Sequence, residues 1–277
     1  MSPFPFTYKS EANILIMGVG LMGQHMASNV LNWLDVKTLV LADHAETILL
    51  GTEETRLADF AASVRAGQHG SADVIAETVD VTSEEQVRSL LERHGKIDYL
   101  MHTAGIAPSP LTPPEQITKE AIMKAYEVNL WGAHNVIKQG VNSGNLRDAR
   151  GVIILSTAAK VGAEGRSSSA YEESKGGLLN LVTLQSRHYA ESYGLVLNGL
   201  APSPLRGPMA EQHPISAGRL KAVEEATPMG GLTEPKHISA ATMFFWADEC
   251  WCAGEVLTTD GGYTKHKPIF GALPGTS

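Results

Sequence analysis

Short apolar runs rich in β-branched residues alternate with longer amphipathic segments along nearly the whole chain. Runs of this length, bounded by Gly, Pro or polar residues, are typical of strands that are buried on both faces of a sheet. Seven strands are expected, at residues 14–17, 38–42, 74–79, 97–101, 152–155, 195–200 and 255–258. Strands that alternate with helices pair in parallel. The pattern therefore predicts an α/β protein, with a Rossmann-like doubly wound parallel sheet of about seven strands in a three-layer αβα sandwich.

Composition bounds the class of protein. The 277 residues are 43% hydrophobic, enough for one sizeable core, and no linker divides them, so we expect a single domain over residues 1–277. The net charge is −8 and the basic residues are scattered, which argues against nucleic acid or an anionic membrane as a partner. No apolar run is long enough to span a membrane, and the first residues lack the pattern of a secretory signal, so a cytoplasmic protein is expected.

Cys250 and Cys252 are the only cysteines, and they are separated by one residue. No second Cys or His pair stands at zinc-finger spacing, so neither a disulfide framework nor a structural metal site is expected. The sequence predicts that both are ordinary buried thiols.

The first expected strand runs directly into a glycine-rich turn, Gly18-Val19-Gly20-Leu21-Met22-Gly23, and then into an amphipathic helix. Strand, Gly-x-Gly-x-x-Gly and helix together are a dinucleotide-binding pattern, because backbone N–H groups at the helix start face the pyrophosphate. The turn is the expected phosphate site, formed by Gly18, Gly20, Leu21, Met22 and Gly23.

Acidic residues follow the next two strands. Asp43 ends the second strand, 25 residues after Gly18, where a carboxylate binds the adenosine ribose hydroxyls and repels a 2′-phosphate. No Arg or Lys stands directly after it, so NAD is favoured over NADP. Asp80 and Val81 end the third strand, where they are candidates for the adenine edge, although an Asp there could equally cap the following helix. Thr82 and Glu85 form a capping-box pattern for that helix.

Tyr171 and Lys175 stand four residues apart in a segment with helical character, so they share one helix face. A nearby ammonium stabilises a phenolate and lowers the pKa of a tyrosine from its ordinary value near ~10. The pair is a candidate acid/base, although the same spacing also occurs by chance on solvated helices.

Several further motifs fall in one order along the chain: His102-Thr103-Ala104-Gly105, Val128-Asn129-Leu130, Tyr171-x-x-x-Lys175, Asn198-x-x-x-Pro202 and Asp260-Gly261-Gly262. Together with the glycine-rich turn, they resemble the compact single-domain branch of the short-chain dehydrogenase/reductase (SDR) family over nearly the whole length.

The resemblance implies an NAD-dependent alcohol dehydrogenase or ketone reductase. Tyr171 would pass the proton, Lys175 would hold the nicotinamide ribose, and Asn129 would seat a water that links the lysine to solvent. A Ser near the end of the fifth strand would orient the substrate oxygen. The other cofactor contacts would come from Thr103, Ala104, Gly105, Pro202 and Leu205.

Counting residues back from Tyr171 does not identify the expected catalytic serine. The family places it thirteen residues before the tyrosine, and that position here is Ala158. The local pattern of Ser and small residues instead favours Ser156, with Thr157 second. The extra residues would then lie within 164–169, at little entropic cost.

Other departures from the family pattern concern cofactor and sheet contacts. The glycine-rich loop is one residue shorter than usual, His102 and Thr103 replace two Asn residues, and Gly207 stands where the family often has a Thr. The altered loop, together with Ala158 at the counted serine position, leaves a second interpretation open, in which the protein binds NAD(H) as a regulator and has lost turnover. A third, an enoyl reductase of the same superfamily, is disfavoured because that branch spaces Tyr and Lys more widely.

Residues 204–227 carry Met209, Ile215, Leu220 and Val223 at helix-like spacing and are expected to form a substrate lid, or else a plain surface helix. The expected substrate is a small neutral secondary alcohol or its ketone, cyclic or aromatic. The tail, residues 265–277, extends past the family's usual end and would cap a neighbouring subunit of a homotetramer or homodimer.

Overall fold

The computed structural model describes residues 6–67, 71–108, 112–161, 169–211 and 216–265. Within them, seven strands form one sheet in the order β5-β2-β1-β6-β7-β8-β9, and every neighbouring pair is parallel. The strands are β1 (Ala12–Met17), β2 (Val36–Asp43), β5 (Asp73–Thr78), β6 (Tyr99–His102), β7 (Arg150–Ile154), β8 (Val196–Pro202) and β9 (Val256–Thr259). All seven expected strands are present, so the predicted Rossmann-like sheet is confirmed.

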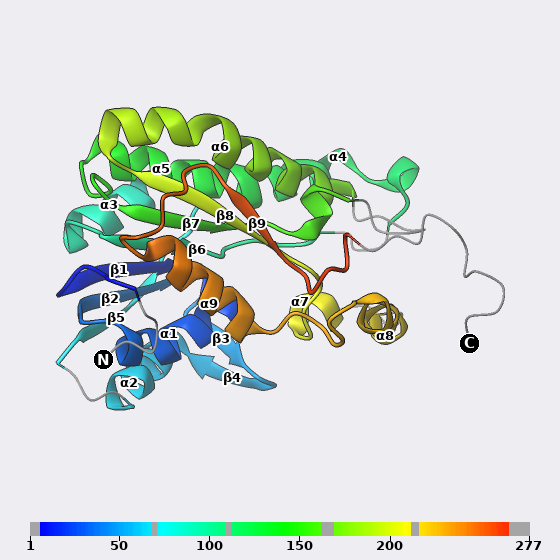
Figure 1. The fold of residues 1–277 in the computed structure, drawn as a ribbon, viewed down its shortest axis with the longest axis horizontal. Helices are drawn as coiled ribbons and strands as arrows, with labels where there is room; N and C mark the ends of the chain where they lie inside the picture. Colours follow the sequence, from blue (N-terminus) through cyan, green and yellow to red (C-terminus); the bar gives the residue numbers. More distant parts are fainter. Residues whose placement is uncertain (1–5, 68–70, 109–111, 162–168, 212–215, 266–277) are drawn as a thin grey trace.

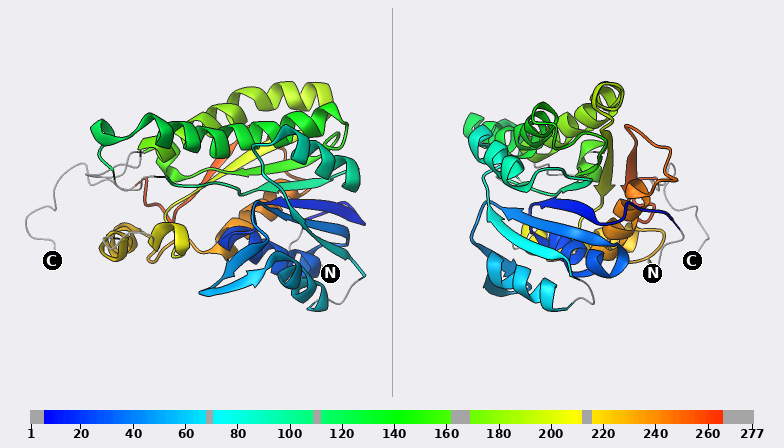
Figure 2. Two further views of the ribbon diagram at one scale, coloured as in Figure 1. Left: turned by 180° about the vertical axis from the view of Figure 1, so that it is seen from behind. Right: turned by 90° about the vertical axis from the view of Figure 1, so that its left-hand side faces the viewer.

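Helices cover both faces of this sheet, as Figures 1 and 2 show. One face carries α1 (Leu21–Trp33), α2 (Leu57–Ala66) and α9 (Pro235–Trp246), and the other carries α3 (Glu84–His94), α5 (Gly132–Asn142) and α6 (Ser169–Tyr193). Each layer has its own apolar cluster, one around Phe60 and Trp246 and the other around Leu90 and Leu178. Burial of these clusters on either side of β1 and β6 holds the three layers together.

The remaining helices and helical turns lie at or near the carboxyl ends of the strands. They are the 3₁₀ turns η1 (Pro114–Gln116) and η3 (Thr157–Ala159), α4 (Lys119–Ala125), the π-helical turn η2 (Tyr126–Trp131), α7 (Pro208–Glu211) and α8 (Ser216–Ala226). In α8 the expected apolar residues Leu220 and Val223 are buried, whereas Met209 in α7 is 44% exposed. Ile215 and most of the expected tail lie outside the described residues.

An antiparallel hairpin that the sequence did not predict follows β2. Its strands are β3 (Thr47–Leu50) and β4 (Glu53–Arg56), joined at Gly51, which has φ +65°. The hairpin packs Ile48 into the core beside α2 and leaves Leu49 and Leu50 exposed. It therefore extends the structure next to the end of β2, where Asp43 lies.

The capping box expected at Thr82 and Glu85 is wrong by one residue. The N-cap of α3 is Ser83, whose Oγ accepts a hydrogen bond from Gln86 N at 3.3 Å. The Asp80 carboxylate accepts from Thr82 N at 2.8 Å, and this tight turn moves the helix start to Glu84. The Gln86 amide oxygen accepts from Asp80 N rather than from the N-cap backbone.

Candidate active site

The glycine-rich turn between β1 and α1 is shaped by close backbone contacts. Gly18 has φ +99°, and a Cβ there would lie 2.4 Å from Ala104 N; a Cβ on Gly23 would lie 2.2 Å from Gly18 O. Gly20, by contrast, has no heavy atom within 4 Å of a built Cβ, and as N-cap of α1 it provides no side-chain cap. There is thus open space beside Gly20, and no side chain caps the first N–H groups of α1, an arrangement that suits a pyrophosphate.

Asp43 lies directly beside this turn. Its Oδ2 accepts a hydrogen bond from Val19 N at 2.6 Å, and its Oδ1 contacts His44 Nδ1 at 2.9 Å. The carboxylate is thus held at the end of β2 within reach of the turn, on the side of the site that the sequence assigns to the adenosine ribose.

The side chain of Gln24 joins the turn to the hairpin. Its Nε2 donates to Val19 O and to Leu49 O, both at 2.8 Å, and the residue is buried. The backbone N–H of Val19 is therefore bound by Asp43, and its carbonyl oxygen is bound by Gln24. This contact had no signal in the sequence, because a glutamine in the middle of an amphipathic helix is an ordinary surface residue.

The segment after β6 packs against the same turn. Thr103 N and Ala104 N both donate to Met17 O, and Thr103 Oγ1 donates to Gly18 O at 2.7 Å. The Thr103 hydroxyl thus ties the segment after β6 to Gly18 of the glycine-rich turn. Gly105 lies next to it, and a Cβ there would be 3.4 Å from Lys175 Nζ.

Tyr171 and Lys175 both lie on the first turns of α6, and the Lys175 ammonium is 5.6 Å from the centre of the Tyr171 ring. Lys175 is buried and donates to Ile154 O at 2.8 Å. Desolvation raises the pKa of the Tyr171 phenol, while a hydrogen bond from Ser156 opposes that rise. Burial lowers the pKa of Lys175 to about 8, so at neutral pH the ammonium remains the main form.

Of the two candidate hydroxyls, the structure brings Ser156 to Tyr171. Ser156 is the N-cap of η3, where its Oγ accepts from Ala158 N at 3.1 Å, and its hydroxyl is hydrogen-bonded to the phenol of Tyr171. Thr157 is buried at the start of η3. Residues 162–168, which contain most of the expected insertion, lie outside the described residues.

Asn129 is in the π-helical turn η2, between α4 and α5. Its side chain is fully buried and joins two segments: Oδ1 accepts from Ile106 N at 2.7 Å, and Nδ2 donates to Ile106 O at 2.9 Å and to Ser174 Oγ at 2.8 Å. Ser174, adjacent to Lys175, was not singled out from the sequence.

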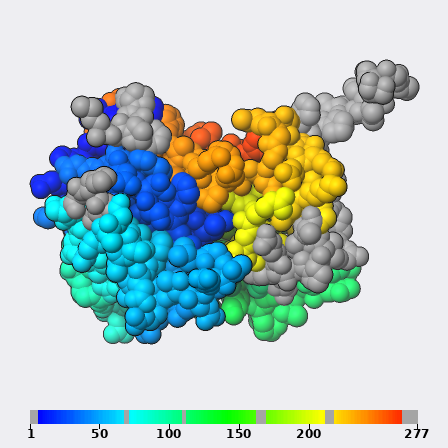
Figure 3. All heavy atoms as spheres, turned by 90° about the horizontal axis from the view of Figure 1, so that it is seen from below, coloured from blue at the N-terminus to red at the C-terminus, as the bar shows by residue number. Residues whose placement is uncertain are grey.

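Pro202 ends β8, and the loop after it, which contains Leu205, returns to the glycine-rich turn. A Cβ on Gly207 would lie 3.1 Å from the Leu21 side chain. Figure 3 shows this arrangement on one face of the molecule, where the segment around residue 205 (yellow) lies next to α1 and the hairpin (blue). The turn, the strand ends and this loop thus border one site.

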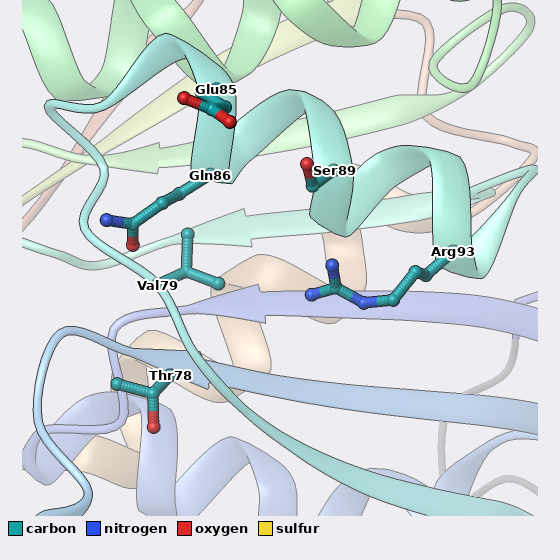
Figure 4. Close-up of a pocket in the computed structure, with 6 residues that line it drawn as sticks. All are labelled: Thr78, Val79, Glu85, Gln86, Ser89 and Arg93. Carbon is teal, nitrogen blue, oxygen red and sulfur yellow. The ribbon is translucent and has the colours of Figure 1, made fainter.

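Of the two remaining cofactor candidates, Val81 is buried and Asp80 is exposed, with its carboxylate engaged in the turn before α3. A cavity of about 260 Å³ lies nearby, between β5 and α3 (Figure 4). It is lined by Thr78, Val79, Glu85, Gln86, Ser89 and Arg93. None of these residues belongs to the candidate active site.

A family model described as enoyl-(acyl carrier protein) reductase, one of the models of the SDR family, matches residues 40–264. The chain belongs to the short-chain dehydrogenase/reductase family. Among SDR relatives, it is 28% identical over 231 residues to cis-4-hydroxycyclohexanecarboxylate dehydrogenase of Sinomonas cyclohexanicum, covering 81% of this chain and 89% of the relative. It is 31% identical over 192 residues to L-fucose dehydrogenase of Oryctolagus cuniculus, covering 66% of each.

Solved structures support the same SDR fold. Levodione reductase superposes with a TM-score of 0.77 at 25% identity, covering 93% of this chain and 99% of that one. A gluconate 5-dehydrogenase from Burkholderia cenocepacia, solved with NADP and tartrate, has a TM-score of 0.78 at 22% identity, covering 94% and 98%. In the described part of the chain, no helix is long and apolar enough to cross a membrane.

Proposed function

We propose that this SDR protein is an NAD-dependent oxidoreductase that interconverts a secondary alcohol and its ketone. The observation that carries the proposal is the joining of Ser156 to Tyr171, with Lys175 one helical turn further along α6. This is an acid/base with a hydrogen-bonding neighbour and a cation, in the same site as the start of α1, which has no side-chain cap. Membership of a family of oxidoreductases supports it.

The residues present fit a nicotinamide dinucleotide. Gly18, Gly20, Leu21, Met22 and Gly23 would hold the pyrophosphate, Asp43 the adenosine ribose, and Lys175 the nicotinamide ribose. The Asp43 carboxylate would repel a 2′-phosphate, so NAD is the favoured cofactor. When bound, the cofactor supplies or accepts the hydride.

Tyr171 would donate a proton to the carbonyl oxygen in reduction and accept it from the hydroxyl in oxidation. Ser156 would donate a hydrogen bond to the same oxygen and orient it. Burial alone works against this role by raising the pKa of Tyr171. The hydrogen bond from Ser156 opposes that rise, and the charged form of Lys175 would lower the pKa of Tyr171 further by favouring the phenolate.

The substrate we propose is a small neutral cyclic or aromatic secondary alcohol. The Sinomonas relative is named for a cyclic secondary alcohol, which supports a ring substrate, and that alcohol also carries a carboxylate. A cytoplasmic homotetramer or homodimer stays a prediction from the sequence.

Replacement of Tyr171 by Phe tests the proposal. Loss of the phenol should lower turnover by at least about 10²-fold, the range of general acid/base catalysis, while NADH affinity stays within a few fold. Oxidation of NADH would be followed with a panel of cyclic, aromatic and aliphatic ketones, and binding by NADH fluorescence. Retention of most activity by this variant would remove Tyr171 from the catalytic role. Binding of NADH by the wild type without turnover on any ketone would favour a regulator.

The two hydroxyls near the end of β7 can be separated in the same assay. Because Ser156 is hydrogen-bonded to Tyr171, Ser156→Ala should reduce kcat far more than Thr157→Ala. Thr157→Ala is the matched control, since it removes a neighbouring hydroxyl from the same turn. The opposite order of effects would assign the role to Thr157.

A further inference from the structure

We propose that Ser174 is a positioning residue, whose hydroxyl fixes the Asn129 amide and ties the π-helical turn η2 to the Tyr171–Lys175 segment of α6. The inference rests on the proposed function, because it concerns how the acid/base pair of that reaction is held. The hydroxyl of Ser174 is bonded to Tyr171 O and to Asn129 Nδ2. It acts through Asn129.

The hydrogen bonds of Ser174 admit one assignment. Its side chain is fully buried, and its Oγ lies 2.7 Å from Tyr171 O and 2.8 Å from Asn129 Nδ2. A serine hydroxyl has one hydrogen, and a backbone carbonyl can only accept. The hydrogen therefore goes to Tyr171 O, and the serine oxygen must accept from Asn129. The group of Asn129 that faces Ser174 is thus its NH₂.

With this contact, both hydrogens and the oxygen of the Asn129 amide are bonded. The second Nδ2 hydrogen goes to Ile106 O, and Oδ1 accepts from Ile106 N. Asn129 is 0% exposed, so water cannot replace a lost partner at the surface. Removal of the Ser174 hydroxyl would leave a buried donor without a partner, and it would cut the link between η2 and α6.

The orientation of the amide matters for Lys175. A Cβ built on Gly105 would lie 3.2 Å from Asn129 Oδ1 and 3.4 Å from Lys175 Nζ, so these two atoms border the same small space. The negative end of the amide dipole therefore lies on the lysine side, and the NH₂ group lies on the serine side. His102, whose charged form would oppose the ammonium, is buried and neutral. A fixed amide thus favours the charged lysine, and through it the phenolate of Tyr171.

The test is the titration of Tyr171, followed by tyrosinate absorbance as the difference between each protein and the same protein carrying Tyr171→Phe. In Ser174→Ala the midpoint should rise by about 0.5–1 pH unit, because the ammonium is less well stabilised. The acid limb of kcat/KM for alcohol oxidation should move by the same amount. Ser174→Cys, which fills the space with a poor acceptor, should behave like Ser174→Ala. Ser174→Thr, which keeps a hydroxyl, should restore most of the wild-type midpoint.

Thr183→Ala is the matched control. Thr183 lies on the same helix and its hydroxyl donates to Leu179 O at 2.8 Å, but it is exposed, so its removal should leave the midpoint unchanged. An unchanged midpoint in both Ser174→Ala and Ser174→Cys would overturn the inference. So would a loss of rate that is equal at all pH values. A shifted midpoint in a protein that turns over no alcohol would support the inference and count against the proposed function.

Discussion

His102 is a buried side chain at an unusual electrostatic position. It ends β6, is 1% exposed, and neither ring nitrogen has a hydrogen-bond partner within the described structure. Desolvation, together with the nearby charge of Lys175, lowers the pKa of His102 to about 3. The imidazole therefore remains neutral at any pH where the protein is expected to work, and no positive charge competes with Lys175.

This burial predicts acid sensitivity. The unfolded state takes up the histidine proton near pH ~6.5, whereas the folded state does not until about pH 3. The stability from neutral His102 is thus complete above pH ~6.5 and is lost as the pH falls below it. Between pH 7 and pH 5 this residue should cost about 2 kcal/mol of unfolding free energy.

The variant His102→Leu, of similar size, should lose about 2 kcal/mol less than the wild type over the same pH interval. Urea denaturation at pH 7 and pH 5 measures the difference. His188→Gln, at an exposed position of α6, is the control and should follow the wild type. Equal acid sensitivity in wild type and His102→Leu would contradict a neutral buried imidazole.

At the scale of elements, the start of α3 offers a clear choice between two neighbouring hydroxyls. Ser83 accepts from Gln86 N, so Ser83→Ala should lower the unfolding free energy by about 1 kcal/mol, the usual value of an N-cap. Thr82→Ala should cost less, because Thr82 N donates to Asp80 and Thr82 O accepts from Trp131, and both of these backbone hydrogen bonds remain in the variant. Thermal or urea unfolding measures both. A larger loss from Thr82→Ala would restore the cap that the sequence pattern suggested.

The strands of the sheet could be predicted because they are apolar on both faces and stand between helices. The hairpin β3–β4 could not, since its second strand, Glu53-Glu54-Thr55-Arg56, has no apolar residue and resembles the start of a helix. What makes it a strand is the two-residue turn at Gly51 and the docking of Leu49 O on Gln24. That contact spans 25 residues and leaves no local pattern.

In the candidate site, too, residues with a local sequence pattern could be predicted, and residues that depend on contacts distant in the sequence could not. Tyr171 and Lys175 stand out because their spacing has chemical meaning within one helix. For the serine, a local pattern favours Ser156 whereas counting points to Ala158, so this role stays a prediction. Ser174 was missed, because its partner Asn129 is 45 positions away and only the fold brings the two together.

At the scale of the whole molecule, cofactor binding should raise the unfolding free energy and the Tm. A ligand at about 100 times its Kd adds about 2.7 kcal/mol to the unfolding free energy, which corresponds to several degrees in Tm for a chain of this size. NADH should raise Tm more than NADPH at equal concentration, and Asp43→Ala should narrow the gap, because the carboxylate that opposes a 2′-phosphate is gone. Differential scanning fluorimetry measures these shifts. Equal shifts for both cofactors in the wild type would show that Asp43 does not discriminate between them.

The bridge made by Gln24 has a consequence for anyone who wishes to redesign cofactor preference. Its amide holds Val19 O of the glycine-rich turn and Leu49 O of the hairpin together, while Asp43 holds Val19 N. The loop after β2 is therefore not a detachable module. Replacing this loop alone would remove the hydrogen bond from Gln24 to Leu49 O and would weaken the support of the glycine-rich turn. The turn, Gln24 and the hairpin therefore have to be exchanged together.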